Sequence, residues 1–425
     1  MIVYEHDFTI ESSAERETRM AQAHEQLLHE HDSGKVGYYE LPKTSQLLAA
    51  EVKEFEGDHP LLGKEGEITD IAVIGIGGSS LGIKAVDALL GAKEAPVRTL
   101  HFFENSDPVS ISRTMAKLER ERTFFIVISK SGGTIETISI FKTLIAHFEL
   151  DLDDADNDRI AVITDEGSAL SRFADAHDLV QFHIPKNVGG RFSVLSAVGV
   201  VPLVFAGYDV ASLLRGAGDL IERMWIKEAD HLLRKALFLA THREDHGINV
   251  LFSYADDLHH FTKWYVQLWG ESLGKIDAKG QRMGMTPVGL IGAVDQHSFL
   301  QLLIEGPLDK TVTFIRVADF DNDLRIPELS LEHIEKTDFV NGKTFTELIN
   351  AQCEATRESL RRSGVPTDTI VLDRIDAEHV GELIAYFELL TSLTGAMLGI
   401  DTYNQPGVEL GKRILYDTFK KDADT

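Results

Sequence analysis

Residues 129–134 combine three hydroxyl side chains, two glycines and one lysine, in the order Ser-Lys-Ser-Gly-Gly-Thr. They follow an apolar run at 123–128 and precede a predicted helix at 135–148. A turn of this kind offers backbone N–H groups, hydroxyl donors and a helix N-terminus, and these groups can hold a phosphate. Ordinary strand-to-helix turns are also rich in Gly and Ser, so the stretch taken alone favours neither interpretation.

A second glycine-rich loop, Gly-Ile-Gly-Gly-Ser-Ser-Leu-Gly at 75–82, opens another predicted helix. The dinucleotide-binding fingerprint G-x-G-x-x-G requires glycine at its last position, where this chain has Ser80. That difference argues against NAD, and serine hydroxyls suit a small anion better. Two such loops on strands of one sheet indicate a phosphate site more specifically than either loop does.

Arg191 stands directly after Gly189 and Gly190 in the segment 187–199, which reads NVGGRFSVLSAVG. The glycines allow the backbone to approach a ligand closely, and arginine is a permanent cation. Arg191 can therefore stabilise a negative charge that develops during a reaction. A plain ion pair with one of the many carboxylates is the alternative, and for this residue taken alone it is the more common case.

The segment 261–275 predicts a helix, and Gln267 and Glu271 are four residues apart on one face of it. Glutamates on helices usually face solvent. Trp269 and Leu273 flank Glu271, however, and partial burial there would make it a more useful general base near neutral pH.

Two further groups that could do chemistry lie near turns of the C-terminal half. His297 follows a predicted strand at the start of a helix, where an imidazole can either cap the helix or take part in catalysis. A Gly/Pro turn carries Gln405 and leads to Lys412. The other histidine groups, at 29–31 and 259–260, are better explained as solvated or structural. They lack a matching set of carboxylates or cysteines at metal-ligand spacing, so we expect no metal.

These side chains need a scaffold that brings the ends of several strands together. Apolar strand-like runs alternate with amphipathic stretches from residue 70 to about 185, and the same rhythm returns after a long helical stretch at 193–243. This βαβ rhythm predicts an α/β fold of two doubly wound parallel sheets packed together, with ligands beyond the carboxyl ends of the strands. The predicted strands are 71–76, 98–103, 123–128, 159–164, 179–184, 248–253, 286–293, 310–317 and 368–373.

The same pattern suggests three parts of the chain. We expect a helical N-terminal cap over 1–68, a first α/β domain over 69–209, and a second over 210–425 that includes a C-terminal helical segment. A chain of 425 residues with 43% hydrophobic content is too long for one core and can bury more than one.

Composition limits the partners and the compartment. A formal net charge of −26 argues against nucleic acid or an anionic membrane surface, although a local cluster of cations can still bind an anionic small molecule. No apolar run has the length of a membrane span, and the acidic N-terminus does not resemble a signal peptide. The single cysteine, Cys353, cannot form an internal disulfide, so we expect a cytoplasmic protein.

Six segments together resemble the glucose-6-phosphate isomerase family, in the family's order, from about residue 70 to the C-terminus. The resemblance implies two sugar-isomerase (SIS) type domains, a homodimer, and reversible conversion of glucose 6-phosphate to fructose 6-phosphate without metal or nucleotide. The six segments are GIGGSSLG at 75–82, SKSGGTIET at 129–137, NVGGRFSVLSAVG at 187–199, WGESLGK at 269–275, DQHSFLQLLIEG at 295–306 and GAMLGIDTYNQPGVELGK at 395–412.

The resemblance also implies roles for the residues at matching positions. Glu271 would move the proton between C1 and C2, and Arg191 would stabilise the enediolate. His297, reaching into the partner's active site, and Lys412 would serve ring opening. The phosphate would be held by Ser129, Lys130, Ser131 and Thr134. Gly78 and Ser79 would line the sugar side, and Gln267 and Gln405 would position hydroxyls and phosphate.

Some positions depart from the family pattern, and other functions remain open. Ser80, Ser131 and Asn404 stand where some members have other residues, which leaves the exact phosphate contacts undecided. One alternative is another sugar-phosphate enzyme on the same domains, such as a phosphomannose or bifunctional isomerase; the segments 189–193 and 404–412 argue against it. The other is a non-enzymatic sugar-phosphate sensor, which would have no reason to keep Glu271, His297 and Arg191 together.

Overall fold

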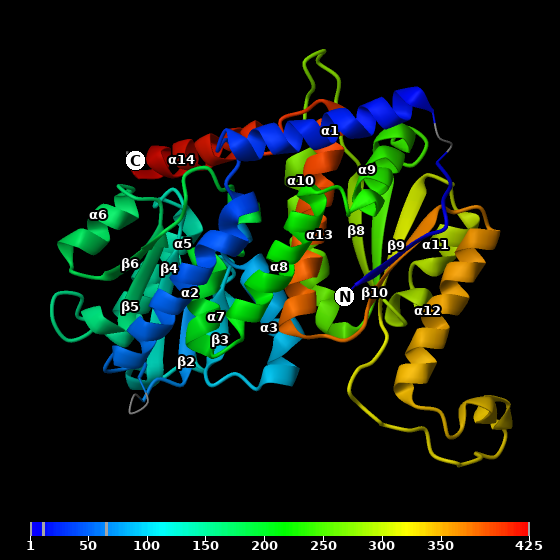
Figure 1. Ribbon diagram of the computed structural model, residues 1–425. Coiled ribbons are helices and arrows are strands. Elements are labelled where there is room, and N and C mark those ends of the chain that lie inside the picture. The colour runs from blue at the N-terminus through cyan, green and yellow to red at the C-terminus, as the bar shows by residue number, and fades with distance from the viewer. Residues whose placement is uncertain (1, 11–12, 64–66, 424–425) are drawn as a thin grey trace.

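The computed structural model describes residues 2–10, 13–63 and 67–423, and within them the chain forms two five-stranded sheets surrounded by helices (Figure 1). The first sheet is entirely parallel in the order β3-β2-β4-β5-β6, and the five strands predicted there are confirmed. Its strands are β2 (Asp70–Ile74), β3 (Thr99–Phe103), β4 (Thr123–Ile128), β5 (Ile160–Thr164) and β6 (Val180–His183).

The second sheet has the order β1-β10-β9-β7-β8 and is parallel except at one edge. Its four predicted strands are confirmed, and the fold is α/β with two mainly parallel sheets, as the sequence pattern predicted. Its strands are β1 (Val3–His6), β7 (Ile248–Tyr254), β8 (Thr286–Ile291), β9 (Lys310–Val317) and β10 (Thr367–Leu372).

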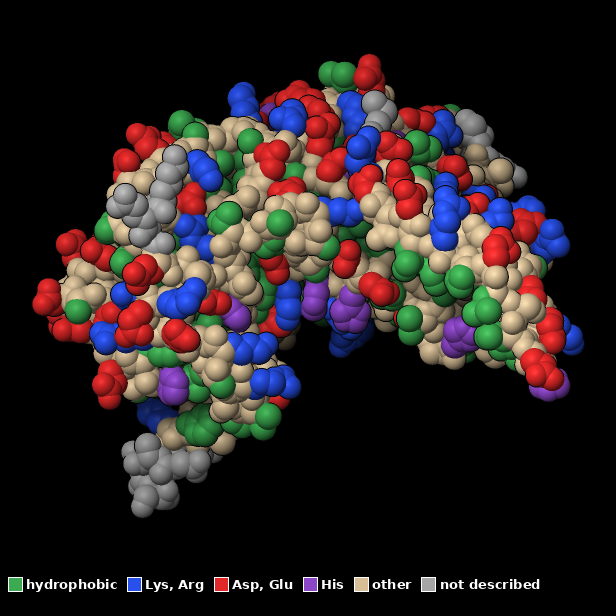
Figure 2. All heavy atoms as spheres, turned by 90° about the horizontal axis from the view of Figure 1, so that it is seen from below, with side chains coloured by type: hydrophobic (Ala, Val, Ile, Leu, Met, Phe, Trp, Pro, Cys, Tyr) green, Lys and Arg blue, Asp and Glu red, His purple; other side chains and the backbone are tan. Residues whose placement is uncertain are grey.

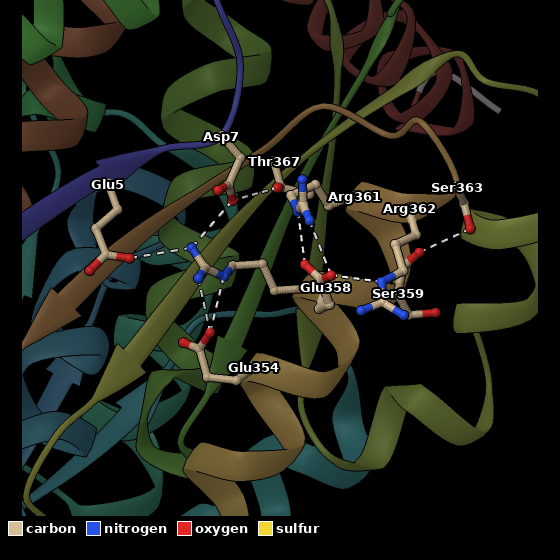
Figure 3. A network of polar contacts seen from close by, with 10 residues as sticks. Glu5, Asp7, Glu354, Glu358, Ser359, Arg361, Arg362, Ser363 and Thr367 are labelled. Atoms are coloured by element: carbon tan, nitrogen blue, oxygen red, sulfur yellow. Dashed lines mark hydrogen bonds and ion pairs between the residues drawn. The ribbon is translucent and has the colours of Figure 1, made fainter.

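The antiparallel edge strand β1 was not predicted from the sequence, which reads as mostly helical before residue 68. Val3 pairs with Val371, and the side chains of β1 alternate between exposed and half-buried. Arg357 donates from Nη1 to Glu5 Oε2 within the strand and to Asp7 Oδ2 just after it, both at 3.3 Å. Figure 3 shows Glu5 and Asp7 pointing toward the polar side chains near α12. Backbone pairing and these ion pairs hold β1, and four residues with so little apolar surface give no strand signal.

The central strands of both sheets are buried on their two faces, as is usual for parallel sheets. In β4, Phe124, Ile126 and Ile128 face the main hydrophobic core, whereas Phe125 and Val127 pack in a separate cluster on the outer face. The same alternation in β9 divides its residues between the main core and a third cluster under α12. This explains why the strands read as nearly continuous apolar runs.

A single hydrophobic core joins the two sheets. The central helix α13 is buried along almost its whole length and packs on α1, α8, α9 and α10 (Figure 1). The two halves therefore pack tightly against each other, as predicted. The helices are α1 (Ala14–Asp32), α2 (Leu41–Asp58), α3 (Leu81–Glu94), α4 (Pro108–Met115), α5 (Ile135–Phe148), α6 (Ala169–Ala176), α7 (Ala197–Ala206), α8 (Val210–Trp225), α9 (Asp230–His242), α10 (His259–Leu273), α11 (Leu300–Glu305), α12 (Phe345–Arg362), α13 (Ala377–Leu398) and α14 (Glu409–Ala423).

The last helix, α14, differs from the rest because its described side chains are exposed. Leu410, Ile414, Tyr416 and Phe419 are 59%, 58%, 60% and 67% exposed. Seen from below, the surface is hollowed between two lobes, acidic side chains are spread over both lobes, and Lys, Arg and His side chains border the hollow (Figure 2). In the described part of the chain, no helix is both long enough and apolar enough to span a membrane.

Candidate active site

The two glycine-rich loops lie at the carboxyl ends of neighbouring strands, where the sequence pattern predicted them. One loop connects β2 to α3 and includes a short 3₁₀ turn at Gly77–Ser79, and the other connects β4 to α5. Strands β2 and β4 are hydrogen-bonded neighbours in parallel register, so both loops emerge at the same edge of the sheet. This is the position at which open α/β sheets bind ligands.

The loop after β4 is built around a buried hydroxyl. Ser129 is 1% exposed, and its Oγ lies 2.9 Å from Oγ1 of Thr134. Gly132 has a φ of +70°, and a Cβ there would lie 2.7 Å from the backbone N of Leu170, so the turn requires glycine. The Thr134 side chain makes no capping hydrogen bond to the first turn of α5. This residue therefore leaves the N-terminal N–H groups of α5 uncapped, and an anion site needs such free N–H donors. The side chain of Ser131 is exposed.

Lys130 connects this loop to the chain that leads to Arg191. Its ammonium donates to the backbone oxygen of Lys186 at 3.2 Å and to that of Val188. Burial lowers the pKa of Lys130 below its usual value. The ammonium is held at the rim of the loop by carbonyl groups, which a phosphate oxygen can replace.

The loop after β2 packs backbone to backbone against the segment that carries Arg191. A Cβ on Gly78 would lie 2.3 Å from the carbonyl oxygen of Gly190, so no larger residue fits there. Gly77 has a φ of +61°, and Ser79 is half-buried. The predicted sugar-lining residues therefore lie directly beside Arg191.

Arg191 is the most connected side chain of the site. It is 2% exposed and uses all three guanidinium nitrogens. Burial lowers the pKa of Arg191 and the nearby Glu271 carboxylate opposes this effect, but an arginine stays charged in either case. Its hydrogen bonds run from Nε to Ser272 Oγ (2.7 Å), from Nη1 to Glu271 Oε2 (3.3 Å) and Gln405 Oε1 (3.0 Å), and from Nη2 to the backbone oxygens of Thr402 (2.6 Å) and Asn404 (3.2 Å).

Glu271 and Gln267 share one face of α10, as their spacing predicted. Gln267 donates from Nε2 to Glu271 Oε1 at 3.1 Å, while Arg191 holds the other oxygen. The Glu271 side chain is 36% exposed, so it is accessible to a ligand. A Cβ on Gly77 would lie 2.9 Å from Gln267 Nε2, which places Gln267 beside the loop after β2. An accessible carboxylate next to a fixed cation can accept a proton while the cation stabilises the resulting anion.

Lys275, the last residue of the segment 269–275, is a nearby group whose contacts could not be predicted from the sequence. Its ammonium donates to the carbonyl oxygens of Glu271 at 2.7 Å and Ser272 at 3.1 Å, at the C-terminal end of α10. Burial, and next the charge of Arg191, lower the pKa of Lys275 to about 8. Lys275 therefore fixes the end of the helix that carries Glu271.

Two of the predicted catalytic residues lie apart from this cluster in the single chain. His297 is exposed in a short 3₁₀ turn (Val294–His297) after β8, and Lys412 pairs with Glu409 at 2.8 Å on the exposed helix α14. Among the contacts of the described residues, none joins either side chain to Arg191 or Glu271.

Several partners of Arg191 lie within the segments that resemble the family, but their contacts with Arg191 could not be predicted from the sequence. Ser272 follows Glu271 directly, and the carbonyl oxygens of Thr402 and Asn404 precede Gln405. A backbone oxygen leaves no signal in the side-chain pattern, so these partners could only be found from the structure. In the described ranges, no group of three or more His, Cys, Asp or Glu side chains is arranged to hold a metal ion.

Comparison with known proteins agrees with this geometry. The family model described as phosphoglucose isomerase matches residues 52–424. A glucose-6-phosphate isomerase from Campylobacter jejuni is 43% identical over 90% of this chain and 92% of its own length. Two crystal structures share the fold. A hypothetical protein from Thermus thermophilus has a TM-score of 0.87 and 32% identity, over 99% of this chain and 100% of that one. A glucose-6-phosphate isomerase from Chlamydia trachomatis has a TM-score of 0.83 and 22% identity, over 100% of this chain and 89% of that one. The chain belongs to the phosphoglucose isomerase family.

Proposed function

We propose that this protein is a glucose-6-phosphate isomerase, an aldose-ketose isomerase that converts glucose 6-phosphate to fructose 6-phosphate reversibly, in glycolysis and gluconeogenesis. The observation that carries the proposal is the contact between Arg191 and Glu271 beside two phosphate-type loops. Family membership and the 43% identity to a relative of that name support the substrate.

In this proposal, Glu271 acts as the base that shuttles one proton. Its carboxylate removes the proton from C2 of the open-chain aldose, and the electrons of that C–H bond form the C1–C2 double bond of an enediolate. The carboxyl group then delivers a proton to C1, after partial exchange of that proton with solvent; the hydroxyl proton on O2 moves to O1, and the ketose results. Nothing is oxidised or reduced overall. Arg191 stabilises the negative oxygen of the intermediate because it is positive at every step.

The phosphate is bound by the loop after β4. We assign it to Ser129, Lys130, Ser131 and Thr134, with the uncapped N-terminus of α5 as a further donor set. The hydrogen-bonded hydroxyls of buried Ser129 and half-buried Thr134 support this assignment.

The sugar itself lies between this loop and the helix that carries the base. Gly78 and Ser79 line it, and Gln267 and Gln405 position its hydroxyls and the phosphate. Support comes from the contact of Gln405 with Arg191 and of Gln267 with Glu271.

Ring opening is assigned to His297 and Lys412, and this assignment requires a homodimer in which His297 enters the partner's site. The exposed position of His297 and the exposed apolar side chains of α14 are what a second copy of the chain would cover. A C₂ interface would complete both sites at once, since each chain gives what it receives.

We further propose that the enzyme works without metal or other cofactor, in the cytoplasm. Arg191 supplies the fixed positive charge that a metal would otherwise provide, and the one cysteine is buried and unpaired. The division into a cap over 1–68 and two SIS-type domains over 69–209 and 210–425 also belongs to this proposal.

One assay tests the proposed activity. Purified protein is dialysed against a chelator and given glucose 6-phosphate, and fructose 6-phosphate is measured directly; parallel reactions contain mannose 6-phosphate. Efficient production of fructose 6-phosphate from glucose 6-phosphate, unchanged by the chelator, is expected. Faster turnover of mannose 6-phosphate would instead favour a phosphomannose enzyme, and binding without turnover would favour a sensor.

A further inference from the structure

The turn after α13 surrounds Arg191 with oxygen atoms, so the position of this turn controls the geometry of the candidate site. Thr402 and Asn404 supply backbone oxygens and Gln405 supplies Oε1. Within the turn, the carboxylate of Asp401 accepts hydrogen bonds from two of the next three residues. These local bonds shape the turn, but they do not hold it against the rest of the protein.

A buried carboxylate on α1 holds the turn through two phenols. Oε2 of Glu30 accepts the hydroxyl of Tyr403 at 2.8 Å and that of Tyr39 at 3.3 Å, and the two hydroxyl oxygens are 2.9 Å apart. Glu30 is 4% exposed and Tyr39 is 3% exposed. The other carboxylate oxygen accepts Nε2 of Gln26 at 3.0 Å. A carboxylate that is satisfied by hydrogen bonds in a buried setting fixes its partners strongly.

Two other contacts connect the same region to α1 and to Arg191. The ring of Tyr403 lies 5.6 Å from the ring of Phe192, measured between centroids, and Phe192 directly follows Arg191. Arg19 on α1 donates from Nη2 to the backbone oxygen of Met397, at the end of α13, at 2.9 Å. The turn is therefore held at its start by Arg19 and at its middle by Glu30.

We propose that Glu30, Tyr39 and Tyr403 are positioning residues, which hold the turn after α13 so that its oxygen atoms keep Arg191 aligned with the reacting carbons. The inference rests on the role proposed above for Arg191. None of the hydrogen bonds of these three residues reaches the loop after β4, so loosening the network should leave phosphate binding intact. A loosened network should slow only the reaction steps that need an aligned guanidinium group of Arg191.

The most direct variant is Tyr403→Phe, which keeps the ring and its contact with Phe192 but removes the hydroxyl. Loss of its hydrogen bonds to Glu30 and Tyr39 should lower kcat by about three- to tenfold, with KM changed less than about twofold. A phosphorylated five-carbon aldonate, whose carboxylate imitates the enediolate, should bind more weakly by the same factor as kcat. Inorganic phosphate, which probes only the loop after β4, should inhibit as before.

A matched control separates positioning from general stability. Tyr208 is 6% exposed and donates to Asp87 Oδ1 at 2.6 Å, so Tyr208→Phe also removes a buried phenol-to-carboxylate hydrogen bond, but outside the turn. This variant should lower the melting temperature without changing kcat or the affinity for the aldonate.

Variants of Glu30 test whether Glu30 and Tyr403 act as a unit. Glu30→Gln keeps one oxygen acceptor and should lose less activity than Glu30→Ala. The double variant Glu30→Gln/Tyr403→Phe should lose no more activity than the more damaging single variant. Full multiplication of the two losses would contradict a shared network.

Arg191→Lys is measured alongside these variants. Near-normal turnover in that variant would overturn the role of Arg191 and, with it, this inference. If Arg191→Lys loses turnover while Tyr403→Phe matches Tyr208→Phe in kcat and aldonate affinity, the role of Arg191 stands and the positioning network is overturned.

Discussion

Nη1 of Arg191 lies 3.3 Å from Oε2 of Glu271, and this contact connects the two halves of the molecule. Arg191 follows the last strand of the first sheet, whereas Glu271 lies on the helix after β7 of the second. The pair therefore exists only because the two sheets share one core around α13. A substitution in either half of the molecule can reach the same site.

The first prediction concerns the guanidinium. Arg191→Lys keeps a positive charge, but a single ammonium group cannot reproduce the hydrogen bonds that the three guanidinium nitrogens donate. We expect kcat to fall by about 10²- to 10³-fold in a folded protein. Arg98→Lys is the control. Arg98 is 9% exposed and donates a 2.6 Å hydrogen bond to Glu56, and this pair lies outside the candidate site. Equal kcat losses in the two variants would contradict a specific role for Arg191.

The second prediction concerns the phosphate loop. Ser129→Ala removes a buried hydroxyl, so KM for glucose 6-phosphate should rise about three- to tenfold while kcat stays close to normal. Inhibition by inorganic phosphate should weaken in parallel. Ser171→Ala removes another buried hydroxyl, which donates to Gln181 at 2.9 Å, and should change neither constant. A fall in kcat at unchanged KM for Ser129→Ala would remove this residue from phosphate binding.

The third prediction concerns the subunits. Inactive Glu271→Gln and His297→Ala proteins are mixed, dissociated and reassociated. If His297 acts in the partner's site, one site of each mixed dimer is intact and the other carries both defects. Random reassociation gives about half mixed dimers, so about a quarter of normal sites should return. Mixed dimers that are confirmed by mass but show no gain over their parents would place His297 within its own chain.

The fourth prediction concerns a buried carboxyl group outside the site. Glu388 is 1% exposed, its Oε1 has no hydrogen-bond partner among the described residues, and burial raises the pKa of Glu388 well above its usual value. A raised native pKa means that the folded state binds the proton more tightly than the unfolded state. Glu388 therefore contributes its full stabilisation below about pH 4.5, and this contribution is lost as the pH rises through the pKa of the folded state. The loss is about 1.4 kcal/mol for each unit by which the folded-state pKa exceeds the unfolded-state pKa.

Glu388→Gln should therefore stabilise the protein more at pH 8 than at pH 5, and melting temperatures across that range measure the difference. Glu378→Gln, an exposed substitution on the same helix, should show no such trend. An equal effect of Glu388→Gln at both pH values would mean that the carboxyl group does not titrate differently in the folded state.

Much of the fold could be predicted from the sequence because both faces of the central parallel strands are buried. Runs such as 123–128 and 310–317 are apolar or β-branched almost throughout, and these two coincide with β4 and β9. Strand β1 could not be predicted, since it is four residues long and is held by edge pairing and ion pairs.

The site was predictable in its local parts and not in its long-range contacts. Helical spacing placed Gln267 beside Glu271, but no periodic pattern connects Arg191 with a helix 80 residues later. The same is true of Glu30, whose partner Tyr403 is 373 residues away. Glu30 lies outside the six segments that resemble the family, so its role could be inferred only from the packed structure.

The central claim is that Glu271 transfers the proton between C1 and C2, and isotope exchange in D₂O tests it most directly. The normal enzyme should exchange deuterium at C2 of glucose 6-phosphate during turnover. Glu271→Gln should reduce both exchange and isomerisation by about 10²- to 10⁴-fold, because an amide cannot accept the proton. Inhibition by inorganic phosphate should remain within about twofold, and Glu305→Gln, on α11, should behave as the normal enzyme. Exchange at the normal rate in Glu271→Gln would show that another group is the base.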